Sequence, residues 1–270
     1  MSTKVFSPEE IVNQTLNSSV KKVEKSFLTS LLLGILAGSF IGLGALFYTI
    51  VKSDQTYSFA TKQILGGFVF SLGLILVIIA GAELFTGNNL IAIAWAEKKV
   101  STKQMMRNWG IIFFSNMIGA ISLAVMVYFS GHLDMNNGAI AETYLKMADA
   151  KCNLPFMTAF FRGILCNILV CLGVWMAMGG KTITDKILAI VFPITLFVAA
   201  GFEHSIANLF IIPLGLLIKT FSDVQITTSF LSISGMIKNL IPVILGNIIG
   251  GSVFIGLMYH LIFLNNKKKA

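Results

Sequence analysis

The residues best placed to do chemistry in this chain are a glutamate, a histidine and an asparagine that interrupt a long apolar stretch. Glu203, His204 and Asn208 lie within residues 200–208, and the first two are the only ionisable residues in the range 187–218. A charged side chain at the centre of a bilayer costs several kcal/mol on insertion scales, so such residues are usually functional. The chemistry that these residue types support is hydrogen bonding to, or proton exchange with, a solute inside the membrane.

A second copy of this pattern lies 120 residues earlier in the chain. The aligned positions are Ala80 with Ala200, Gly81 with Gly201, Glu83 with Glu203, and Asn88 with Asn208. A membrane helix can break only where its freed backbone groups line a cavity or meet protein partners. Each break also starts a new helix, whose unpaired N–H groups favour an anion or an electron-rich solute. Two such breaks at matching places in two halves indicate a transport site.

The elements that must position these residues are membrane-spanning helices. Of the 270 residues, 56% are hydrophobic and only 12% are charged, which is too little polar surface for a soluble domain. Apolar stretches of about 20 residues or more, long enough to span a bilayer, occur near 27–50, 63–96, 106–130, 155–178, 186–218 and 236–264. The second and fifth exceed a simple span and carry the polar interruptions. We therefore predict an all-α membrane protein with six transmembrane helices, of which the second and fifth are broken.

Weaker matches extend the repeat over the whole chain. Gly34 in the first span matches Gly163 in the fourth at an offset of 129 residues, and Asn116 in the third matches Asn247 in the sixth at an offset of 131. Because each half has three spans, which is an odd number, the second half must enter the membrane from the opposite side. This pattern predicts an inverted 3+3 repeat whose broken segments face one another near the midplane.

The distribution of lysine and arginine predicts the orientation. Thirteen lie in the segments that share a side with the N-terminus and six lie on the other side, so the positive-inside rule places both termini in the cytoplasm. The predicted organisation is a cytoplasmic amphipathic N-terminal helix over residues 1–26, a three-span repeat over 27–131, an external loop over 132–154, a second three-span repeat over 155–264 and a cytoplasmic tail over 265–270. Ser7, Pro8 and Glu10 form the expected start of the N-terminal helix.

Several classes of function are disfavoured. The net charge of +8 follows mostly from the topological bias and gives no reason to expect a nucleic-acid partner. Cys152, Cys166 and Cys171 suggest neither a disulfide framework nor a metal site. No nucleophile–base pair is visible, so an integral membrane enzyme ranks last, with no catalytic residue and no cofactor expected.

Structural alternatives exist for each polar residue. A lone buried histidine can be purely structural, but the position of His204 beside a break favours a place on the permeation path. Glu83 and Glu203 could relay protons, although two glutamates at equivalent positions more simply accept hydrogen bonds from loop amides and hold each break open. Asn167, in the fourth span, could be a pore donor or a packing device, and the sequence does not separate the two.

Three segments together resemble the signature segments of the formate/nitrite transporter family. They are Ala-Gly-Ala-Glu-Leu-Phe-Thr-Gly-Asn at 80–88, Arg-Gly-Ile-Leu-Cys-Asn at 162–167 and Gly-Phe-Glu-His-Ser-Ile-Ala-Asn at 201–208. The resemblance covers essentially all six spans. It implies an aquaporin-like fold, a homopentamer with one pore per subunit in the inner (plasma) membrane, and passage of small monovalent anions or their conjugate acids.

The resemblance also implies roles for individual residues. It assigns the pore centre to His204, Thr86 and Asn167, the outer constriction to Phe70, Leu74 and Phe197, the inner constriction to Leu84 and Val170, the outer vestibule cation to Lys151, and the anchoring of the breaks to Glu83, Glu203, Asn88 and Asn208. The formate, nitrite and hydrosulfide branches of the family share nearly the same motifs, and the chain reads most like the hydrosulfide branch.

The leading functional hypothesis is a passive channel. In it, Lys151 concentrates the anion, the apolar constrictions strip its water, and His204 with Thr86 supplies hydrogen bonds or a proton at the midpoint. An apolar constriction admits a neutral acid far more readily than the ion. Two alternatives are a proton-coupled anion symporter and a neutral-solute channel for water or ammonia, which inverted half-helices alone would permit.

Overall fold

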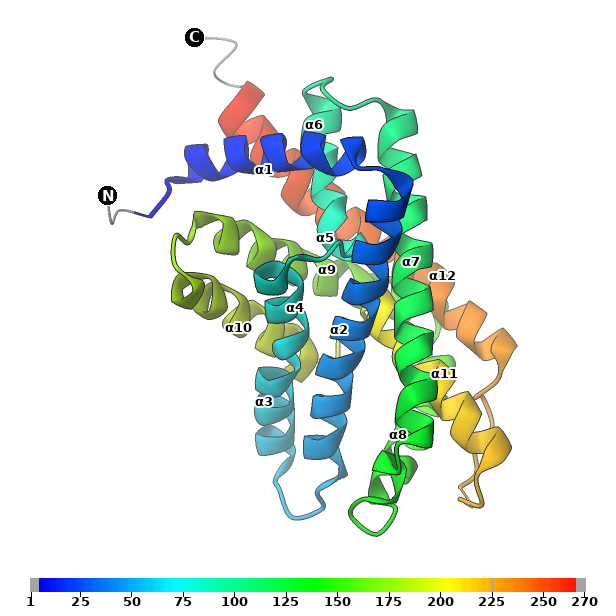
Figure 1. Ribbon diagram of the computed structural model, residues 1–270. Helices are drawn as coiled ribbons and strands as arrows, with labels where there is room; N and C mark the ends of the chain where they lie inside the picture. The colour runs from blue at the N-terminus through cyan, green and yellow to red at the C-terminus, as the bar shows by residue number, and fades with distance from the viewer. Residues whose placement is uncertain (1–4, 225, 266–270) are drawn as a thin grey trace.

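The computed structural model describes residues 5–224 and 226–265, and in these residues every regular element is a helix (Figure 1). Most of the predicted tail over 265–270 and residues 1–4 of the predicted N-terminal helix lie outside the described residues. The first part of the chain forms α1 (Pro8–Glu24), α2 (Phe27–Ser53), α3 (Phe59–Phe70), α4 (Leu72–Leu76), the π-helical turn η1 (Val77–Gly81), α5 (Phe85–Asn88), the 3₁₀ turn η2 (Asn89–Ile91), α6 (Ala92–Ala96) and α7 (Thr102–Phe129).

The rest of the chain continues in the same way. It forms the 3₁₀ turn η3 (His132–Asp134), α8 (Ala139–Cys152), α9 (Phe156–Gly179), α10 (Ile183–Ala199), α11 (Ser205–Phe221), α12 (Ile233–Ile249), the π-helical segment η4 (Gly250–Leu257), α13 (Met258–His260) and η5 (Leu261–Asn265). The predicted external loop over 132–154 is therefore largely helical. We call the end of the molecule that carries α1 the terminal face and the end that carries α8 the loop face (Figure 1).

The first helix starts as the sequence predicts. Ser7 Oγ accepts a hydrogen bond from the N–H of Glu10 at 3.3 Å, and Glu10 Oε2 accepts one from the N–H of Ser7 at 2.7 Å. This reciprocal pair is a capping box, which satisfies two donors that a helix start would otherwise leave unpaired. Val12, Leu16 and Val23 are buried, so α1 lies with its apolar side against the terminal face.

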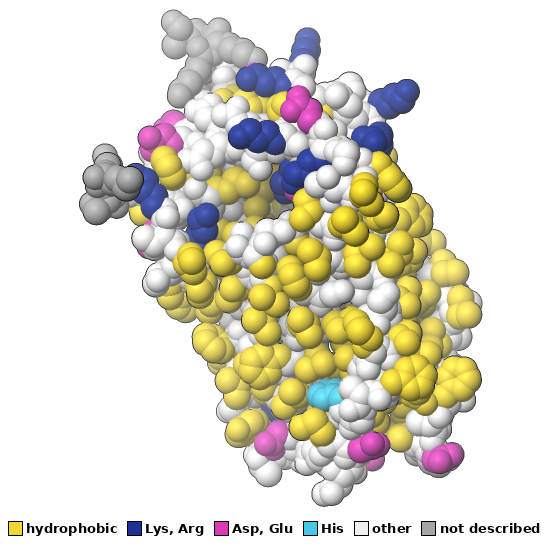
Figure 2. Space-filling view, in the orientation of Figure 1, with side chains coloured by type: hydrophobic (Ala, Val, Ile, Leu, Met, Phe, Trp, Pro, Cys, Tyr) yellow, Lys and Arg dark blue, Asp and Glu magenta, His cyan; other side chains and the backbone are white. Residues whose placement is uncertain are grey.

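Five helical stretches are long and apolar enough to cross a membrane, and they have mean hydropathies between 1.9 and 2.6. They are α2, the stretch Phe59–Gly81, α7, α9 and the stretch Ile233–Asn265. The predicted fifth span is divided into α10 and α11, of 17 residues each. Figure 2 shows hydrophobic side chains covering the middle of the molecule, with Lys and Arg gathered at the terminal face.

Both predicted breaks are present, and they have similar backbone geometry. The chain turns at Gly81, with φ of +82°, and at Gly201, with φ of +69°. A Cβ at either position would meet no atom within 4 Å, so it is the left-handed backbone rather than crowding that requires glycine. The chain then runs extended through Leu84 and His204 before the next helix begins at Phe85 or at Ser205.

Gly119 sets the distance between α2 and α7, and replacing it with alanine should weaken their packing. A Cβ built on Gly119 would overlap the carbonyl oxygen of Ile35, and a backbone atom cannot move aside without separating the helices. We expect Gly119→Ala to lower the free energy of unfolding by about 1–3 kcal/mol, the usual cost of overpacking. Thermal unfolding followed by size-exclusion chromatography in detergent measures the loss.

The matched control is Gly110→Ala on the same helix. A Cβ at Gly110 meets no atom within 4 Å, and alanine is the better helix former, so this variant should unfold at the parent temperature or slightly above it. If both alanine variants unfold at the parent temperature, the close approach at Gly119 does not contribute to stability.

Candidate functional site

The two breaks meet at a buried pair formed by Thr86 and His204. Thr86 Oγ1 lies 3.0 Å from His204 Nε2, and the two side chains come from residues 118 positions apart in the chain. Their residues are 0% and 3% exposed. Thr86 lies in the first turn of α5, and His204 is the residue immediately before α11. The sequence-predicted central residues are therefore brought together at the starts of two half-helices.

The second ring nitrogen of His204 caps α11. His204 Nδ1 lies 3.1 Å from the N–H of Ala207 and accepts its hydrogen bond. Because a backbone N–H can only donate, Nδ1 carries no proton in this arrangement, and the ring is the neutral tautomer with its hydrogen on Nε2. His204 therefore donates to the Thr86 hydroxyl. The Thr86 hydroxyl hydrogen remains available to a solute.

Asn167, on α9, binds the elements around Thr86. Its Nδ2 lies 3.2 Å from the carbonyl oxygen of Thr86, 2.7 Å from Asn89 Oδ1 and 2.6 Å from the carbonyl oxygen of Asn247. Its Oδ1 has no partner among residues 5–224 and 226–265. The amide nitrogen thus ties α5, η2 and α12 together. Asn167 lies beside the central pair rather than lining the same cavity as His204.

Asn116, on α7, holds the first break. Its Oδ1 accepts a hydrogen bond from the N–H of Phe85 at 2.9 Å, and its Nδ2 donates to the carbonyl oxygens of Gly34 at 2.8 Å and Glu83 at 2.9 Å. The Phe85 N–H and the Glu83 carbonyl have no helical partner because the helix is interrupted there, whereas Gly34 lies inside the continuous helix α2. The fully buried Asn116 side chain therefore supplies the hydrogen bonds that the break removes.

Asn247, on α12, does the same at the second break. Its Oδ1 accepts a hydrogen bond from the N–H of Ser205 at 3.0 Å, and its Nδ2 donates to the carbonyl oxygens of Gly163 at 2.9 Å and Glu203 at 3.0 Å. Sequence comparison matched Asn247 with Asn116 as a repeat position and assigned no role to either. The role could have been predicted from the sequence, because an asparagine inside each of two apolar spans needs polar partners, and the breaks leave backbone groups that need them too.

Glu83 belongs to a polar cluster near the terminal face. Its Oε2 accepts a hydrogen bond from Asn88 Nδ2 at 2.8 Å, and Asn88 Nδ2 also lies 3.0 Å from Asn108 Oδ1. Glu83 Oε1 pairs with Lys25, and Lys22 Nζ lies 3.5 Å from Oε2. The sequence predicted hydrogen bonds from loop amides, whereas the carboxylate is bound by side-chain donors.

Glu203 has a corresponding set of partners near the loop face. Its Oε2 accepts hydrogen bonds from Asn208 Nδ2 at 2.6 Å and from Asn239 Nδ2 at 3.4 Å, and Asn208 Nδ2 lies 2.7 Å from Asn239 Oδ1. Glu203 Oε1 forms an ion pair with Lys151 Nζ at 2.8 Å. The predicted vestibule cation, Lys151, is therefore already paired with a carboxylate.

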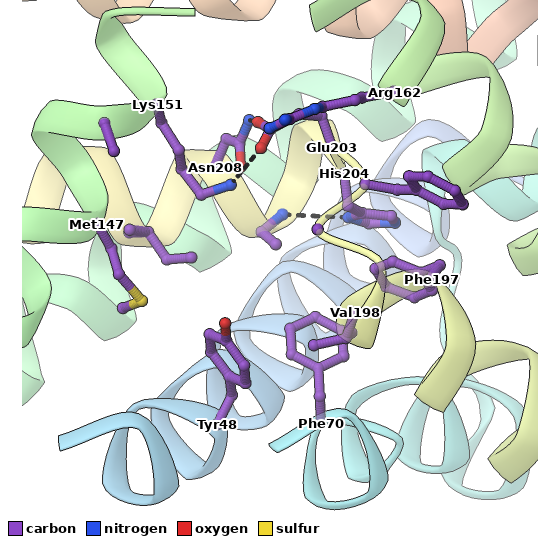
Figure 3. Close-up of a pocket in the computed structure, with 15 residues that line it drawn as sticks. Tyr48, Phe70, Met147, Lys151, Arg162, Phe197, Val198, Glu203, His204 and Asn208 are labelled. Atoms are coloured by element: carbon purple, nitrogen blue, oxygen red, sulfur yellow. Dashed lines mark hydrogen bonds and ion pairs between the residues drawn. The ribbon is translucent and has the colours of Figure 1, made fainter. Parts of the chain in front are cut away.

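A cavity of about 210 Å³ leads to the central pair from the side of Lys151 (Figure 3). Phe70 and Phe197 line it, with ring centroids 5.5 Å apart in an edge-to-face arrangement, and the Phe197 ring stacks on His204 at 6.0 Å. The structure thus brings two of the three residues of the predicted outer constriction together beside His204. Tyr48 and Arg162 also line this cavity, and the sequence analysis assigned neither to it.

The other residues of the predicted constrictions are buried between helices. Leu74, Leu84 and Val170 are each 2% exposed, and none of them lines the 210 Å³ cavity. Leu74 reaches α9, where its Cδ2 lies 3.5 Å from the position of a Cβ on Gly173. A second cavity, of about 530 Å³, lies on the terminal side of the first break and is lined by Gly81 and Val174 among others.

Among the described residues, no group of three or more His, Cys, Asp or Glu side chains is arranged to hold a metal ion. Cys152, Cys166 and Cys171 are free and buried. Burial raises the pKa of the Cys152 thiol on α8, so this thiol is protonated at neutral pH.

Comparisons with known proteins identify the family. The sequence model of the family described as Formate/nitrite transporter matches residues 9–261. The formate channel FocA of Haemophilus influenzae is 39% identical over 267 residues, which cover 95% of this chain and 94% of that protein. The formate channel FocA of Escherichia coli K12 is 38% identical over 268 residues, with the same coverage.

Two solved structures are similar to the whole fold. One is described as a pentameric formate channel with formate bound, and it is 40% identical, with a TM-score of 0.83 over 88% of this chain and 98% of that chain. The other is described as an FNT family ion channel, and it is 29% identical, with a TM-score of 0.83 over 93% of this chain and 98% of that one. These relatives are channels rather than enzymes.

Proposed function

The chain belongs to the formate/nitrite transporter family, and we propose that it is a membrane channel for small monovalent anions of weak acids, with formate as its main substrate. The observation that carries this proposal is the buried hydrogen bond between Thr86 and His204, at the meeting point of two half-helix starts. The Thr86 hydroxyl hydrogen and two positive helix ends then face a solute at the same place.

The proposed path has an apolar constriction on each side of this pair. Phe70, Leu74 and Phe197 form the outer one, and Leu84 with Val170 forms the inner one. The edge-to-face contact of Phe70 with Phe197 supports the first, because the two aromatic rings themselves offer no hydrogen bond to replace the water of an anion. The solute would lose its water at the aromatic rings and regain hydrogen bonds at the central pair.

The hydrogen bonds of His204 favour a channel over a proton-coupled symporter. Nδ1 is occupied by the N–H of Ala207, so protonating the ring would break the cap of α11. In the resting arrangement His204 therefore offers a hydrogen bond from Nε2 and not a transferable second proton. A symporter would need the cap to open in every transport cycle.

Formate is favoured over hydrosulfide by the relatives. The two curated relatives described above are named formate channels, and the structure at 40% identity is described with formate bound. The sequence as a whole was interpreted as most like the hydrosulfide branch, although the branches share nearly the same motifs. Because the relatives described above are named formate channels, we propose formate in place of hydrosulfide.

We propose further that the protein is a homopentamer in the plasma membrane with both termini in the cytoplasm. The pentameric relative supports the stoichiometry, and the concentration of Lys and Arg at the terminal face supports the orientation (Figure 2). Asn167 would hold the pore wall, while Glu83, Glu203, Asn88 and Asn208 would anchor the breaks through the hydrogen bonds given above.

Stopped-flow flux into proteoliposomes tests the proposed function. Purified protein should carry formate and, more slowly, nitrite and hydrosulfide, while osmotic water flow should match that of protein-free liposomes. The same preparation should show five subunits by native mass spectrometry. Water flow without anion flux would favour the neutral-solute channel, and formate uptake that collapses when the proton gradient is removed would favour the symporter.

A further inference from the structure

The side chain of Arg162 carries a charge that the fold does not use. Arg162 lies on α9 in the fourth predicted span and lines the 210 Å³ cavity together with Lys151 and Glu203. Its guanidinium makes no hydrogen bond or ion pair with any residue that the structure describes. An ionisable side chain at membrane depth without a structural partner is by default a candidate functional group.

The repeat supplies an internal control for the structural role of this position. The carbonyl oxygen of Arg162 accepts a hydrogen bond from the N–H of Glu203 at 3.2 Å, and the carbonyl oxygen of Leu33 accepts the same bond from Glu83, also at 3.2 Å. Leu33 and Arg162 are 129 residues apart, which is the repeat offset of the neighbouring glycines. In the first half, a leucine supplies the carbonyl oxygen that accepts this hydrogen bond. Accepting the bond in the second half therefore does not require an arginine side chain.

The balance of charge around the breaks shows what the arginine adds. Near the terminal face, two lysines, Lys22 and Lys25, pair with Glu83. Near the loop face, Lys151 is the single cation that pairs with Glu203, and these two charges cancel. Among the residues that the structure describes, Arg162 therefore supplies a positive charge of the loop-face cavity that no carboxylate pairs with. Figure 3 shows its side chain extending along the same rim of the cavity as Glu203 and Asn208.

We propose that Arg162 is the anion-recognition group of this cavity and that it selects small oxyanions that present two oxygen atoms on one edge. A guanidinium offers parallel N–H donors in a planar fork that matches a carboxylate, whereas an ammonium acts as a point charge. Formate and nitrite fit this fork with both oxygens. Hydrosulfide has a single heavy atom, so it gains only the charge. This inference rests on the proposed function and narrows its substrate class.

The cavity has the size and position that this role requires. A water molecule occupies about 30 Å³ of liquid, so the 210 Å³ volume holds a triatomic or tetratomic anion together with part of its hydration shell. His204 and Phe197 line the inner end of the same cavity. An anion bound at Arg162 would therefore keep some of its water until it reaches the aromatic rings.

Three variants separate the effect of the Arg162 charge, the effect of its paired N–H donors, and the effect of positive charge elsewhere on this face. Arg162→Leu introduces the residue found at the equivalent repeat position, so the fold should be kept. Arg162→Lys keeps the charge and removes the fork. Lys146→Gln is the matched control, because it removes one positive charge from α8 at a side chain that is 61% exposed and does not line the cavity. Identical size-exclusion profiles would establish that all three are folded.

Flux at low ionic strength gives the first readout. For Arg162→Leu we expect the KM for formate to rise about tenfold, the loss of one charge-assisted contact, and the difference to shrink in high salt. Arg162→Lys should raise the KM for formate about threefold and leave that for hydrosulfide unchanged, since only the fork is lost. Lys146→Gln should match the parent. An unchanged formate KM in Arg162→Leu, or equal behaviour of lysine and arginine with both anions, would overturn the inference.

Binding without transport gives the second readout and separates the two proposals. Saturation-transfer NMR on the formate proton detects contact with the detergent-solubilised protein, and this signal should fall in Arg162→Leu but not in Lys146→Gln. If the parent binds formate through Arg162 but does not conduct it, the channel proposal fails and the recognition site stands. If the parent conducts formate and the NMR signal is the same in Arg162→Leu, the recognition site fails and the channel stands.

Discussion

Replacing His204 with asparagine should give a folded, conducting protein whose formate flux lacks any acid response that the His204 imidazole gives the parent, because asparagine cannot titrate. Asparagine is among the best N-cap residues, so its side-chain oxygen can accept the hydrogen bond that Ala207 now donates to Nδ1. It also retains an N–H donor toward Thr86. What it removes is the ability to gain a proton.

The direction of the pH effect follows from the cap. At low pH, protonation of Nδ1 would compete with the hydrogen bond from Ala207, so any response of the parent to acid should include a change at the start of α11. The Asn variant has no such competition, and its flux should follow only the concentration of the transported species. Stopped-flow uptake of formate, measured at a series of pH values with equal pH on both sides, records the two profiles.

Two further variants make the result specific. His204→Leu removes both the cap and the donor, so it should lose flux and stability together. His132→Asn changes a histidine of η3 that does not line the 210 Å³ cavity, and it should keep the parent profile. A parent-like pH profile in His204→Asn for every anion tested would show that the central histidine does not set the pH response, and the constrictions and helix dipoles would have to do so.

Replacing Asn247 with leucine should cause the largest loss of stability of any single change considered. The two side chains are similar in size, but leucine leaves the buried N–H of Ser205 and the carbonyl oxygen of Glu203 without their partner, and it removes an additional hydrogen bond from the Gly163 carbonyl inside α9. Each unsatisfied group costs about 1–3 kcal/mol, so the two groups at the break cost about 2–6 kcal/mol, a large share of the stability of a whole domain. We expect loss of the assembled protein from detergent extracts, measured by size-exclusion chromatography before and after heating.

The same substitution at an exposed asparagine is the control. Asn17 lies on the exposed side of α1, and leucine is a good helix former, so Asn17→Leu should elute and unfold like the parent. Asn116→Leu should reproduce the defect of Asn247→Leu, because Asn116 makes the equivalent three bonds at the first break. A stable, assembled Asn247→Leu protein would mean that water or backbone rearrangement satisfies these groups instead.

Local sequence determined where the chain would break and which polar residues would accompany each break. The glycines at 81 and 201 were identifiable because a left-handed turn in a helix favours a residue without Cβ. The capping box at Ser7 was identifiable because it needs only residues three positions apart. The helical class and most of the apolar stretches followed from composition and length, which do not depend on how segments pack.

The roles of the two glutamates and of the vestibule cation were less accessible to sequence. Glu83 and Glu203 were expected to accept hydrogen bonds from loop amides, but Asn116 and Asn247 serve the backbone while the glutamates bind lysine and asparagine side chains. Asn116 lies on α7 and Asn247 on α12. No local sequence pattern predicts which helix will pack against a break. Lys151 was predicted to be the outer vestibule cation, and its ion pair with Glu203 could not be predicted for the same reason.

Only the tertiary structure decided which distant residues meet. Thr86 and His204 are 118 residues apart, and their 3.0 Å contact requires the two half-helices to point at one another. The same packing neutralises Lys151 with Glu203 and leaves the guanidinium of Arg162 unpaired among the described residues. The sequence contains all of these residues and their spacing. Charge balance, tautomer and exposure depend on distances between helices, and those distances are set by how the glycine-lined surfaces pack in three dimensions.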